Sequence, residues 1–405
     1  MLKLKRLRIE QFRSVARNTE LLFSDGINVL LGQNGTGKTT LLELISMIVR
    51  SNFSTLAKEE LSIEYELSGS EGESVIVVVR NAALPQRSVD LAAREIFQSS
   101  VQLLSGVDRR ELFRYGPEPG SASSDGGRST VRGGVPSPLE PGFLSSYNVR
   151  SDALLQYLLR AGNARRLDES LDLFTKITST DMGDLAGDIL VDKNTWAPNP
   201  FAPPLVSDGI LRKLEALYDP RQPDYSLPLD EPDVLASLKA LMGFDRSELR
   251  VDVSARQRSV TLVRINNLLF RFWWKDGTLI THERLSYGQK RLVAFFYYLD
   301  CNPYTVIADE LVNGLHHRWI TASIDAIGQR QAFLTSQNPL LLDYVPITSA
   351  EEVQRSFVLC RSEPGAGRPG WVWENMTKED AQDLFSAYGV GIEHVSEILQ
   401  SRGLW

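Results

Sequence analysis

The feature that most constrains this chain is the stretch GQNGTGKTT, Gly32 to Thr40. It fits the pattern G-x-x-x-x-G-K-[ST], with the apolar run INVLL before it and the helically spaced LLELISMIV after it. A strand, a glycine-rich loop and a helix are therefore predicted in the order that a P-loop requires. Strands and helices that alternate around such a loop favour an α/β fold, with a mostly parallel sheet and helices on both faces.

The P-loop pattern predicts a site for a nucleoside triphosphate. Glycines let backbone N–H groups close around phosphate oxygens, and the helix N-terminus adds the positive end of its dipole. Lys38 is expected to reach the β and γ phosphates, and Thr39 to give a hydroxyl ligand to Mg²⁺. The predicted cofactors are ATP and Mg²⁺, and the nucleotide-binding residues of this loop are Asn34, Gly35, Thr36, Gly37, Lys38, Thr39 and Thr40.

Two neighbouring acids follow a second apolar strand. The segment TVIADE places Asp309 and Glu310 at the carboxyl end of that strand, where open α/β sheets bind their ligands. We expect Asp309 to hold Mg²⁺ and Glu310 to polarise the attacking water as a general base.

A second anion site is predicted where Ser286 and Gly288 open an apolar helix, 248 residues (286 minus 38) after Lys38. A P-loop leaves the far side of the γ phosphate open, and one chain cannot easily bring both sites to the same phosphate. The economical arrangement is a head-to-tail homodimer, in which Ser286 of each subunit closes over the ATP held by the other.

Composition limits the partners and the compartment. The 405 residues, 42% of them hydrophobic, suit two domains or one large domain with an insertion. Cys301 and Cys360 form no C-x-x-C pair, which excludes a disulfide framework and a cysteine zinc site. No 18 apolar residues run together, so we expect a cytoplasmic protein without a membrane partner.

A net charge of -7 restricts any contact with double-stranded DNA to a local basic patch. One candidate is the N-terminal KLKRLR, and solvated surface charge is the alternative explanation for it and for the arginines of the central region. Those arginines are Arg109, Arg110, Arg114, Arg128, Arg132, Arg150, Arg160, Arg165 and Arg166.

The pattern along the chain predicts four parts. Residues 1–80 form the first part of an ATPase lobe, and residues 248–345 form its second part with an antiparallel subsheet. Between them, residues 81–247 are predicted to be an inserted helical lid, with helices over 91–104 and 151–177 and a flexible loop over 115–142. Residues 346–405 hold two edge strands, SFVLCR and WVWENM, a helix capped by Thr377 and a last helix over 392–399.

On these motifs, the chain resembles the SMC/RecF-like branch of ABC ATPases, which includes the ATPase parts of OLD-type nucleases and several phage-defence ATPases. The resemblance covers residues 1–80 and 248–345. IEQFRSV is similar to the first strand and turn of that branch, which implies that Arg13 contacts the nucleotide. LSYGQ resembles the signature LSGGQ, with Tyr287 in place of the first glycine, and implies that Gln289 belongs to the site with Ser286.

Two further segments resemble this branch with departures. DELVNGLHH is similar to DEPExxLHP, which implies that Leu315 and His316 lie at the dimer interface, although Val312 stands where a second acid is usual. LTSQNP resembles the switch segment TTHSP, with Gln337 at the histidine position. Glutamine can donate a hydrogen bond to the γ phosphate but cannot become cationic. Hydrolysis is then expected to be slow, or ATP serves chiefly to gate a clamp.

Other polar groups are weaker candidates. Gln86 and Gln98 are candidates for the glutamine that many ABC proteins place near magnesium. Adjacent His316 and His317 point apart on a helix, which argues against a shared metal. Asp181, Asp184 and Asp188 fit a solvated helix face better than a nuclease metal cluster.

The leading hypothesis is an ATP-gated homodimeric switch in bacterial DNA maintenance or anti-phage defence, which grips DNA or controls a separately encoded effector such as a nuclease. One alternative is a transporter motor domain, which the long spacing and the lack of a membrane segment oppose. The other is a regulatory scaffold that binds ATP without turnover, which Gln337 favours and Glu310 opposes.

Overall fold

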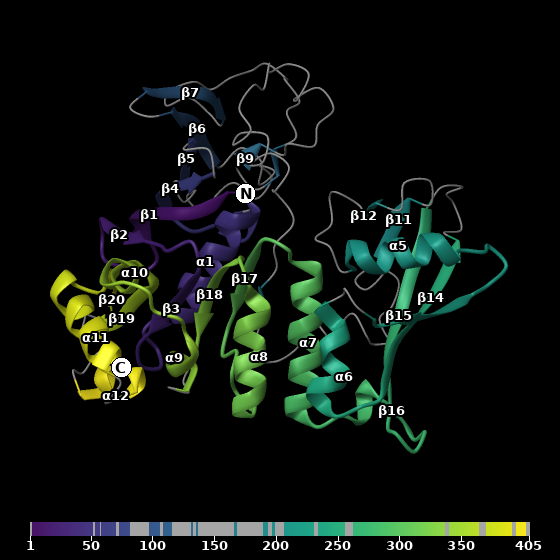
Figure 1. The fold of residues 1–405 in the computed structure, drawn as a ribbon. Coiled ribbons are helices and arrows are strands. Elements are labelled where there is room, and N and C mark those ends of the chain that lie inside the picture. Colours follow the sequence, from purple (N-terminus) through teal and green to yellow (C-terminus); the bar gives the residue numbers. More distant parts are fainter. Residues whose placement is uncertain are drawn as a thin grey trace, which may run out of the picture. The chain divides into compact units, whose positions relative to one another are not determined.

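The computed structural model describes residues 2–51, 53–56, 58–69, 73–81, 97–105, 108–115, 131–132, 135–136, 166–167, 189–192, 197–198, 206–230, 234–255, 262–336, 340–363, 370–390 and 394–401. The chain forms two units, each built from strands and helices (Figure 1). Unit 1 comprises Met1–Gly162, Gln331–Thr335 and Pro346–Trp405, and unit 2 comprises Asn163–Arg330 and Ser336–Val345. This mixture of strands and helices agrees with the predicted α/β class.

An antiparallel sheet forms one layer of unit 1. Its strands lie in the order β2 (Thr19–Leu22), β1 (Lys3–Phe12), β4 (Leu61–Ser68), β5 (Glu73–Asn81), β6 (Phe97–Ser105) and β7 (Asp108–Tyr115). In β4 every second residue is buried, as the alternation of Leu61, Ile63, Tyr65 and Leu67 predicts. This face of the sheet is therefore part of the core of unit 1.

The sequence prediction was wrong for the helix over residues 91–104. Residues 97–105 are strand β6, which pairs antiparallel with β5 and places Val101 opposite Val77. Val101 is fully buried. The apolar residues of QSSVQLL fit both a helical and an alternating pattern, and pairing with β5 on one side and β7 on the other favours the strand by giving its backbone groups partners. The described part of the predicted helical lid therefore includes strands as well as helices.

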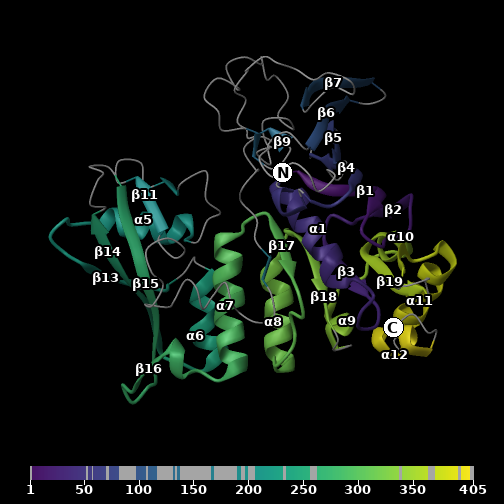
Figure 2. The same cartoon turned by 180° about the vertical axis from the view of Figure 1, so that it is seen from behind.

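A mainly parallel group of strands carries the P-loop in unit 1. The strands lie in the order β18 (Gln331–Thr335), β3 (Ile27–Leu31), β19 (Phe357–Glu363) and β20 (Gly370–Asn375), and only β20 is antiparallel to its neighbour. Helix α1 (Lys38–Arg50) follows β3 and packs beside β18 (Figures 1 and 2). SFVLCR was expected at an edge, but β19 lies between β3 and β20 because its first residues are fully apolar and buried.

The remaining elements of unit 1 are short. Thr377 Oγ1 accepts a hydrogen bond from Asp380 N at 3.1 Å, which confirms the predicted cap of a helix. These elements are η1 (Ser54–Leu56), β8 (Val131–Arg132), β9 (Val135–Pro136), α10 (Ala350–Ser356), α11 (Lys378–Val390) and α12 (Val395–Ser401).

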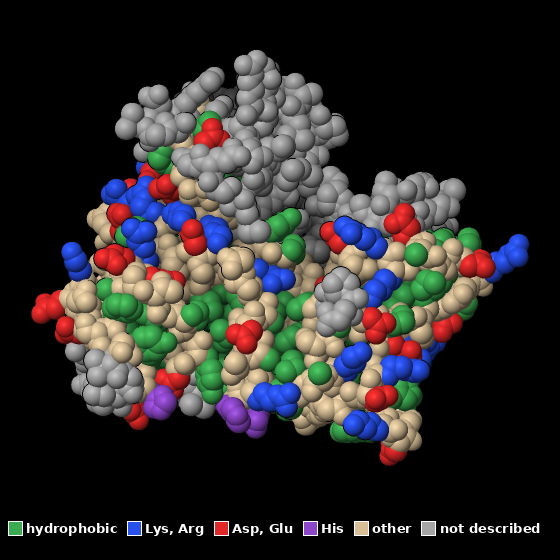
Figure 3. Space-filling view, viewed as in Figure 1, with side chains coloured by type: hydrophobic (Ala, Val, Ile, Leu, Met, Phe, Trp, Pro, Cys, Tyr) green, Lys and Arg blue, Asp and Glu red, His purple; other side chains and the backbone are tan. Residues whose placement is uncertain are grey.

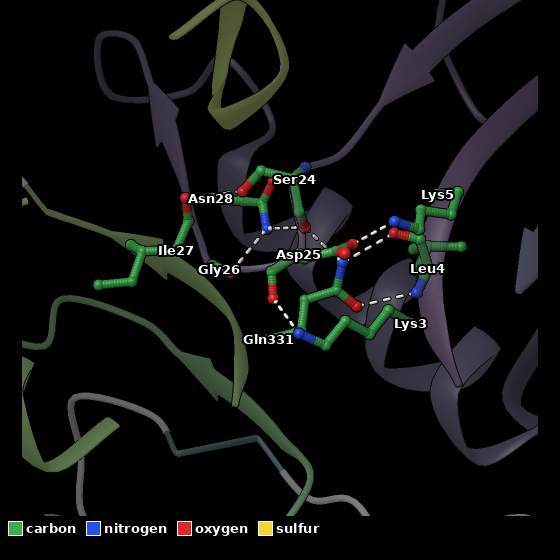
Figure 4. A network of polar contacts seen from close by, with 9 residues as sticks. All are labelled: Lys3, Leu4, Lys5, Ser24, Asp25, Gly26, Ile27, Asn28 and Gln331. Carbon is green, nitrogen blue, oxygen red and sulfur yellow. Dashed lines mark hydrogen bonds and ion pairs between the residues drawn. The ribbon is translucent and has the colours of Figure 1, made fainter. Parts of the chain in front are cut away.

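A buried polar network fixes the start of β3, the end opposite the P-loop (Figure 4). Gln331 donates to Leu4 O and Ser24 O, both at 2.7 Å, and accepts from Leu4 N at 2.8 Å. Asn28 donates to Ser24 O at 3.2 Å and to Ala332 O at 3.1 Å. These bonds join β1, β3 and β18 at side chains that are almost fully buried, so they set the register from which the P-loop starts.

Unit 2 contains a second antiparallel sheet. Its strands lie in the order β12 (Ala197–Pro198), β11 (Ile189–Asp192), β15 (Leu262–Trp273), β14 (Arg246–Ala255) and β13 (Asp224–Pro228), and β16 (Leu279–Thr281) pairs with β15. Unit 2 also holds a parallel pair of strands, β10 (Arg166–Leu167) and β17 (Thr305–Ala308).

Helices complete unit 2. Among them, α7 and α8 lie side by side (Figures 1 and 2). The helices are α5 (Asp208–Leu217), η2 (Val234–Ala236), α6 (Ser237–Met242), η3 (His282–Arg284), α7 (Tyr287–Cys301), α8 (His317–Ile327) and α9 (Leu340–Tyr344). The two units cut across the four ranges expected from the sequence, because residues 346–405 group with the P-loop and residues 262–330 group with part of the insert. The boundaries at 80, 247 and 345 stay predictions.

Candidate functional site

The P-loop has the backbone that a phosphate cradle needs. It connects β3 to α1, and Gly32, Gly35 and Gly37 have φ of 144°, 85° and 84°. These values favour glycine over any residue with a side chain. Close packing adds a second requirement, because a Cβ on Gly32 would lie 2.1 Å from Cys360 O.

The side chain of Lys38 lies along this loop. Its Nζ donates to Gly32 O at 2.6 Å and to Gln33 O at 3.1 Å, and the residue is only 8% exposed. Thr36 Oγ1 also donates to Gln33 O, at 2.7 Å. The ammonium group is thus held against the concave backbone of the loop, next to the N-terminus of α1, where both charges attract an anion.

The other predicted residues of the loop face outward to different degrees. Asn34, Gly35 and Thr39 are exposed, whereas Thr40 is half-buried. An exposed hydroxyl at the first turn of α1 can reach a metal ion bound to phosphate. The glycine cradle, the buried ammonium and this hydroxyl together fit the triphosphate of ATP with Mg²⁺.

Arg13 is held by two carboxylates. Its guanidinium donates to Glu59 from Nε at 2.8 Å and from Nη2 at 3.1 Å, and Nη1 lies 3.5 Å from Glu43 of α1. The hydrogen bond to Glu59 raises the pKa of Arg13 further above its ordinary value, so the group stays cationic. The predicted contact between Arg13 and nucleotide would require the guanidinium to share or leave these carboxylates.

Two tryptophans near the C-terminus contact the P-loop, and no sequence argument assigned them a role. Trp371 Nε1 donates to Gly35 O at 2.9 Å, and Trp373 Nε1 donates to Thr36 O at 3.0 Å. The sequence signal that could have indicated them is WVW, because residues at alternate positions of a strand share one face and the two tryptophans would therefore lie side by side.

In unit 2, Ser286 caps the signature helix α7. Its Oγ accepts from Gln289 N at 3.4 Å, and Ser286 N donates to Gln289 Oε1 at 3.0 Å, which forms a capping box. Ser286 is exposed, and Gln289 is partly engaged in the cap. The helix N-terminus and the exposed serine hydroxyl are the groups that the predicted anion site would use.

Gly288 fits the signature helix against the segment that follows the two acids. A Cβ on Gly288 would lie 2.4 Å from Gly314 O, so this position has no room for a side chain. The exposed Tyr287 ring also lies close to Gly314. Tyr287 therefore replaces a signature glycine at a position where its ring lies beside Gly314 and stays exposed to solvent.

Asp309 and Glu310 follow β17, as the sequence predicts, and are 9% and 6% exposed. Glu310 has a φ of 53°, an unusual value for a residue with a side chain. Arg291 of α7 is fully buried and donates to Asp309 O at 3.1 Å, to Leu311 O at 3.1 Å and to Glu310 O. One buried guanidinium thus holds the backbone of the acid pair to the signature helix.

The predicted interface residues follow in the same segment. Leu315 is 9% exposed, and the exposed His316 caps α8 by accepting from Arg318 N at 3.3 Å. Val312 is fully buried, in surroundings that would destabilise the acid usual at this position.

Several sequence predictions lie outside the described residues. These are Gln337, Gln86, the three aspartates at 181, 184 and 188, and the helix over 151–177. Gln98 is described only as part of the β6 backbone. Within the described ranges, no group of three or more His, Cys, Asp or Glu side chains is arranged to hold a metal ion. In the same ranges, no helix combines the length and the apolarity needed to cross a membrane.

Two family models match different parts of the chain. Residues 6–84 match a model described as "AAA domain". Residues 183–343 match one described as "AAA domain, putative AbiEii toxin, Type IV TA system". The first range contains the P-loop, and the second contains the signature helix and the acid pair.

Curated relatives match short segments. The DNA replication and repair protein RecF of Shewanella denitrificans is 35% identical over 89 residues, which are 20% of this chain and 24% of that protein. The DNA double-strand break repair Rad50 ATPase of Methanopyrus kandleri is 52% identical over 44 residues, which are 11% of this chain and 5% of that protein. The chain thus spans 24% or less of the length of these two relatives.

A solved structure is similar only in outline. The Smc head domain with an extended coiled coil, bound to the C-terminal domain of ScpA and derived from Pyrococcus furiosus, aligns with 96% of this chain and 100% of that chain. The sequence identity is 11% and the TM-score is 0.45, which is too low to support an argument about this chain. The family models and the two curated relatives, in agreement with the P-loop, signature helix and acid pair, support an ATPase of the SMC/RecF-like ABC type.

Proposed function

We propose that this protein is an ATP-hydrolysing switch that closes as a homodimer when ATP binds and reopens after hydrolysis. The observation that carries the proposal is the phosphate cradle of unit 1, in which three glycines have positive φ and Lys38 is held against the loop carbonyls. Such a backbone is suited to binding polyphosphate.

In this proposal the P-loop and Lys38 bind the triphosphate. Mg²⁺, when bound, neutralises charge on the β and γ phosphates, and Thr39 and Asp309 are its proposed protein ligands. Glu310 accepts the proton of the attacking water. Gln337 donates a hydrogen bond to the γ phosphate, and because it cannot become cationic we expect slow turnover.

The homodimer follows from the signature helix. Ser286 and the N-terminal amides of α7 belong to unit 2, whereas the P-loop belongs to unit 1. We propose that these groups bind the γ phosphate of ATP held by a second copy of the chain. The repulsion between triphosphate and acids opposes closure unless Mg²⁺, Lys38 and Ser286 of the neighbour act together.

DNA maintenance is the setting that we propose, because the matched relatives carry DNA repair in their names. The basic first strand does not favour a contact with DNA, because its basic side chains are paired with acids. Arg6 pairs with Glu64 and Glu66, and Lys5 pairs with Asp25. Figure 3 shows basic and acidic side chains interspersed over this region. We therefore assign the contact with double-stranded DNA to the arginines of the insert, such as Arg109, Arg110 and Arg114.

Anti-phage defence is the second setting, favoured by the match of residues 183–343 to the AbiEii-type model. In that setting the switch controls a separately encoded effector, such as a nuclease, instead of gripping DNA.

The test is steady-state ATP hydrolysis over a range of protein concentrations, with and without double-stranded DNA. Glu310→Gln is the control without hydrolysis, and Lys38→Ala is the control that should not bind ATP. We expect turnover per subunit to rise with protein concentration, because the active form is a dimer, and to rise again with DNA. Turnover that DNA does not change would favour the effector setting. Binding of ATP by calorimetry without any turnover would favour a non-hydrolysing scaffold and refute the proposed hydrolysis.

A further inference from the structure

The hairpin of β19 and β20 contacts the P-loop at both ends. At the start of the loop, the backbone of Cys360 in β19 approaches Gly32 so closely that a Cβ would lie 2.1 Å from Cys360 O. At the end of the loop, Trp371 and Trp373 of β20 donate their indole N–H groups to Gly35 O and Thr36 O. The hairpin thus follows the full length of the phosphate cradle.

The two indoles lie directly against Gly37, the last residue before α1. Their rings are stacked with centroids 6.0 Å apart and planes 12° apart. A Cβ on Gly37 would lie 2.8 Å from Trp371 and 3.0 Å from Trp373. Trp373 is 2% exposed, whereas Trp371 is partly exposed. Gly37 is therefore needed for its φ of 84° and also for the close approach of the rings.

The same strand fastens the turn that contains Arg13. Trp371 N donates to Ser14 O, and Ala16 N donates to Trp371 O, both at 2.8 Å. One residue of β20 therefore holds the P-loop with its side chain and the Arg13 turn with its backbone.

Peptide geometry gives these bonds a consequence for phosphate binding. A trans peptide is planar, so its C=O and its N–H point in opposite directions. When Trp371 holds Gly35 O, the N–H of Thr36 is directed away from the tryptophans, and it donates to Gln33 O within the loop at 3.4 Å. When Trp373 holds Thr36 O, the N–H of Gly37 is directed away likewise. Backbone N–H groups at these positions are the groups with which a P-loop binds phosphate.

We propose that Trp371 and Trp373 are positioning residues of the nucleotide site, which hold the carbonyls of Gly35 and Thr36 and so fix the loop conformation in which the amide of Gly37 is directed toward the polyphosphate. The proposal rests on the proposed ATP binding. It assigns the tryptophans to the phosphate chain and not to the adenine base, because their polar contacts are with the loop backbone.

The test compares Trp371→Phe and Trp373→Phe with the native protein. Each variant keeps a ring of similar shape and removes one indole donor. The dissociation constants of ATP and of tripolyphosphate are measured by calorimetry. Since one hydrogen bond is worth about 1 kcal/mol, we expect each variant to bind both ligands about fivefold more weakly. Should Trp373→Phe not fold, the partly exposed Trp371 carries the test alone.

Trp319→Phe is the matched control. Trp319 Nε1 donates to Leu241 O at 3.0 Å, a bond of the same kind within unit 2, so its loss should leave both affinities unchanged. Native-like binding in the Trp371 and Trp373 variants would overturn the proposal. A loss for ATP but not for tripolyphosphate would instead assign the rings to the base, and an equal loss in Trp319→Phe would indicate general destabilisation. If the native protein binds neither ligand, the proposed function itself fails.

Discussion

Arg13 and Glu310, two of the residues predicted to act on the nucleotide, have left-handed backbone with φ of 46° and 53°. For residues with a side chain this conformation costs about 1 kcal/mol or more. It persists only where the surroundings hold it. Arg13 is held by Glu59 and Glu43, and the carbonyl of Glu310 is held by Arg291. Strain of this kind concentrates at functional sites, in agreement with the roles proposed for both residues.

Gly37→Ala should abolish nucleotide binding, because a methyl group there meets Trp371 at 2.8 Å and the residue keeps a φ of 84°. We expect a loss of roughly 1 to 3 kcal/mol in the free energy of unfolding, together with loss of ATP affinity in calorimetry. Gly389→Ala in α11 is the control, because that position is open and an alanine is favourable in a helix. ATP affinity that survives in Gly37→Ala would show that the loop can reshape around the methyl group.

At the residue scale, the sequence was sufficient to predict those residues whose role depends on their neighbours along the chain. The spacing of Gly32, Gly37 and Lys38 predicted a strand, a loop and a helix that the structure confirms. It could not predict Trp371, which contacts Gly35 across a separation of 336 residues. Nor could it predict the φ of Glu310, whose carbonyl accepts a hydrogen bond from the buried Arg291 of helix α7.

Among the elements, α7 joins two parts of the chemistry within unit 2. Ser286 caps its N-terminus, and Arg291 in its second turn holds the carbonyls of residues 309–311. A helix is stiff over so short a distance, so a displacement of Ser286 would be transmitted to the backbone of Glu310.

Arg291→Met should lower turnover while ATP binding to the P-loop is retained. Three buried carbonyls lose a charged donor, so we also expect a loss of roughly 2 to 5 kcal/mol in the free energy of unfolding. Urea unfolding and ADP release measure the two effects. Lys290→Met, the neighbouring change on the same helix, should leave both almost unchanged. Unaltered turnover in a folded Arg291→Met protein would exclude this link.

The turn before α7 should make stability depend on pH. His282 is 5% exposed and its Nδ1 accepts from Phe270 N at 3.2 Å. Burial lowers its pKa below the ordinary value of 6.5, so the unfolded chain takes up the proton at a higher pH than the folded chain. The stability contributed by neutral His282 is therefore fully present above pH 6.5 and is lost as the pH falls.

In His282→Asn the amide oxygen can replace Nδ1 as acceptor, and the fall in unfolding free energy below pH 6.5 should become shallower. Chemical denaturation at several pH values measures this slope. The exposed His317→Asn is the comparison, and an identical slope in both variants would remove His282 as the cause.

At the element scale, long periodic segments were predictable and short ambiguous ones were not. The strands of unit 1 before residue 81 and helix α1 follow their patterns directly. The stretch 97–105 did not, because its apolar residues fit two periods and its pairing with β5 and β7 makes it a strand.

For the whole molecule, ATP should change the assembly state. Glu310→Gln retains the cradle but removes the proposed base, so bound ATP is not consumed and a closed dimer should accumulate. Light scattering should report twice the monomer mass with ATP and Mg²⁺, and the monomer mass with ADP. Adding Ser286→Arg, which fills the exposed anion site, should restore the monomer. A mass that nucleotide does not alter would contradict the homodimeric switch.

For the whole molecule, the sequence predicted the order of the motifs along the chain, but it did not predict which segments lie together in one unit. The sequence places the C-terminal strands after the ATPase lobe, whereas the structure puts β19 beside β3 in the same sheet. Parallel pairing between distant segments depends on the complete set of neighbours and leaves no local pattern.

The contact between the C-terminal tryptophans and the P-loop has a consequence during synthesis. The ribosome produces Gly35 first and Trp371 only 336 residues later, on the order of tens of seconds at typical rates of translation. Until then the nascent chain contains a complete P-loop sequence without the strand that holds its carbonyls. Tight nucleotide binding would therefore come late in the life of each new chain, and an unfinished chain would not compete for ATP.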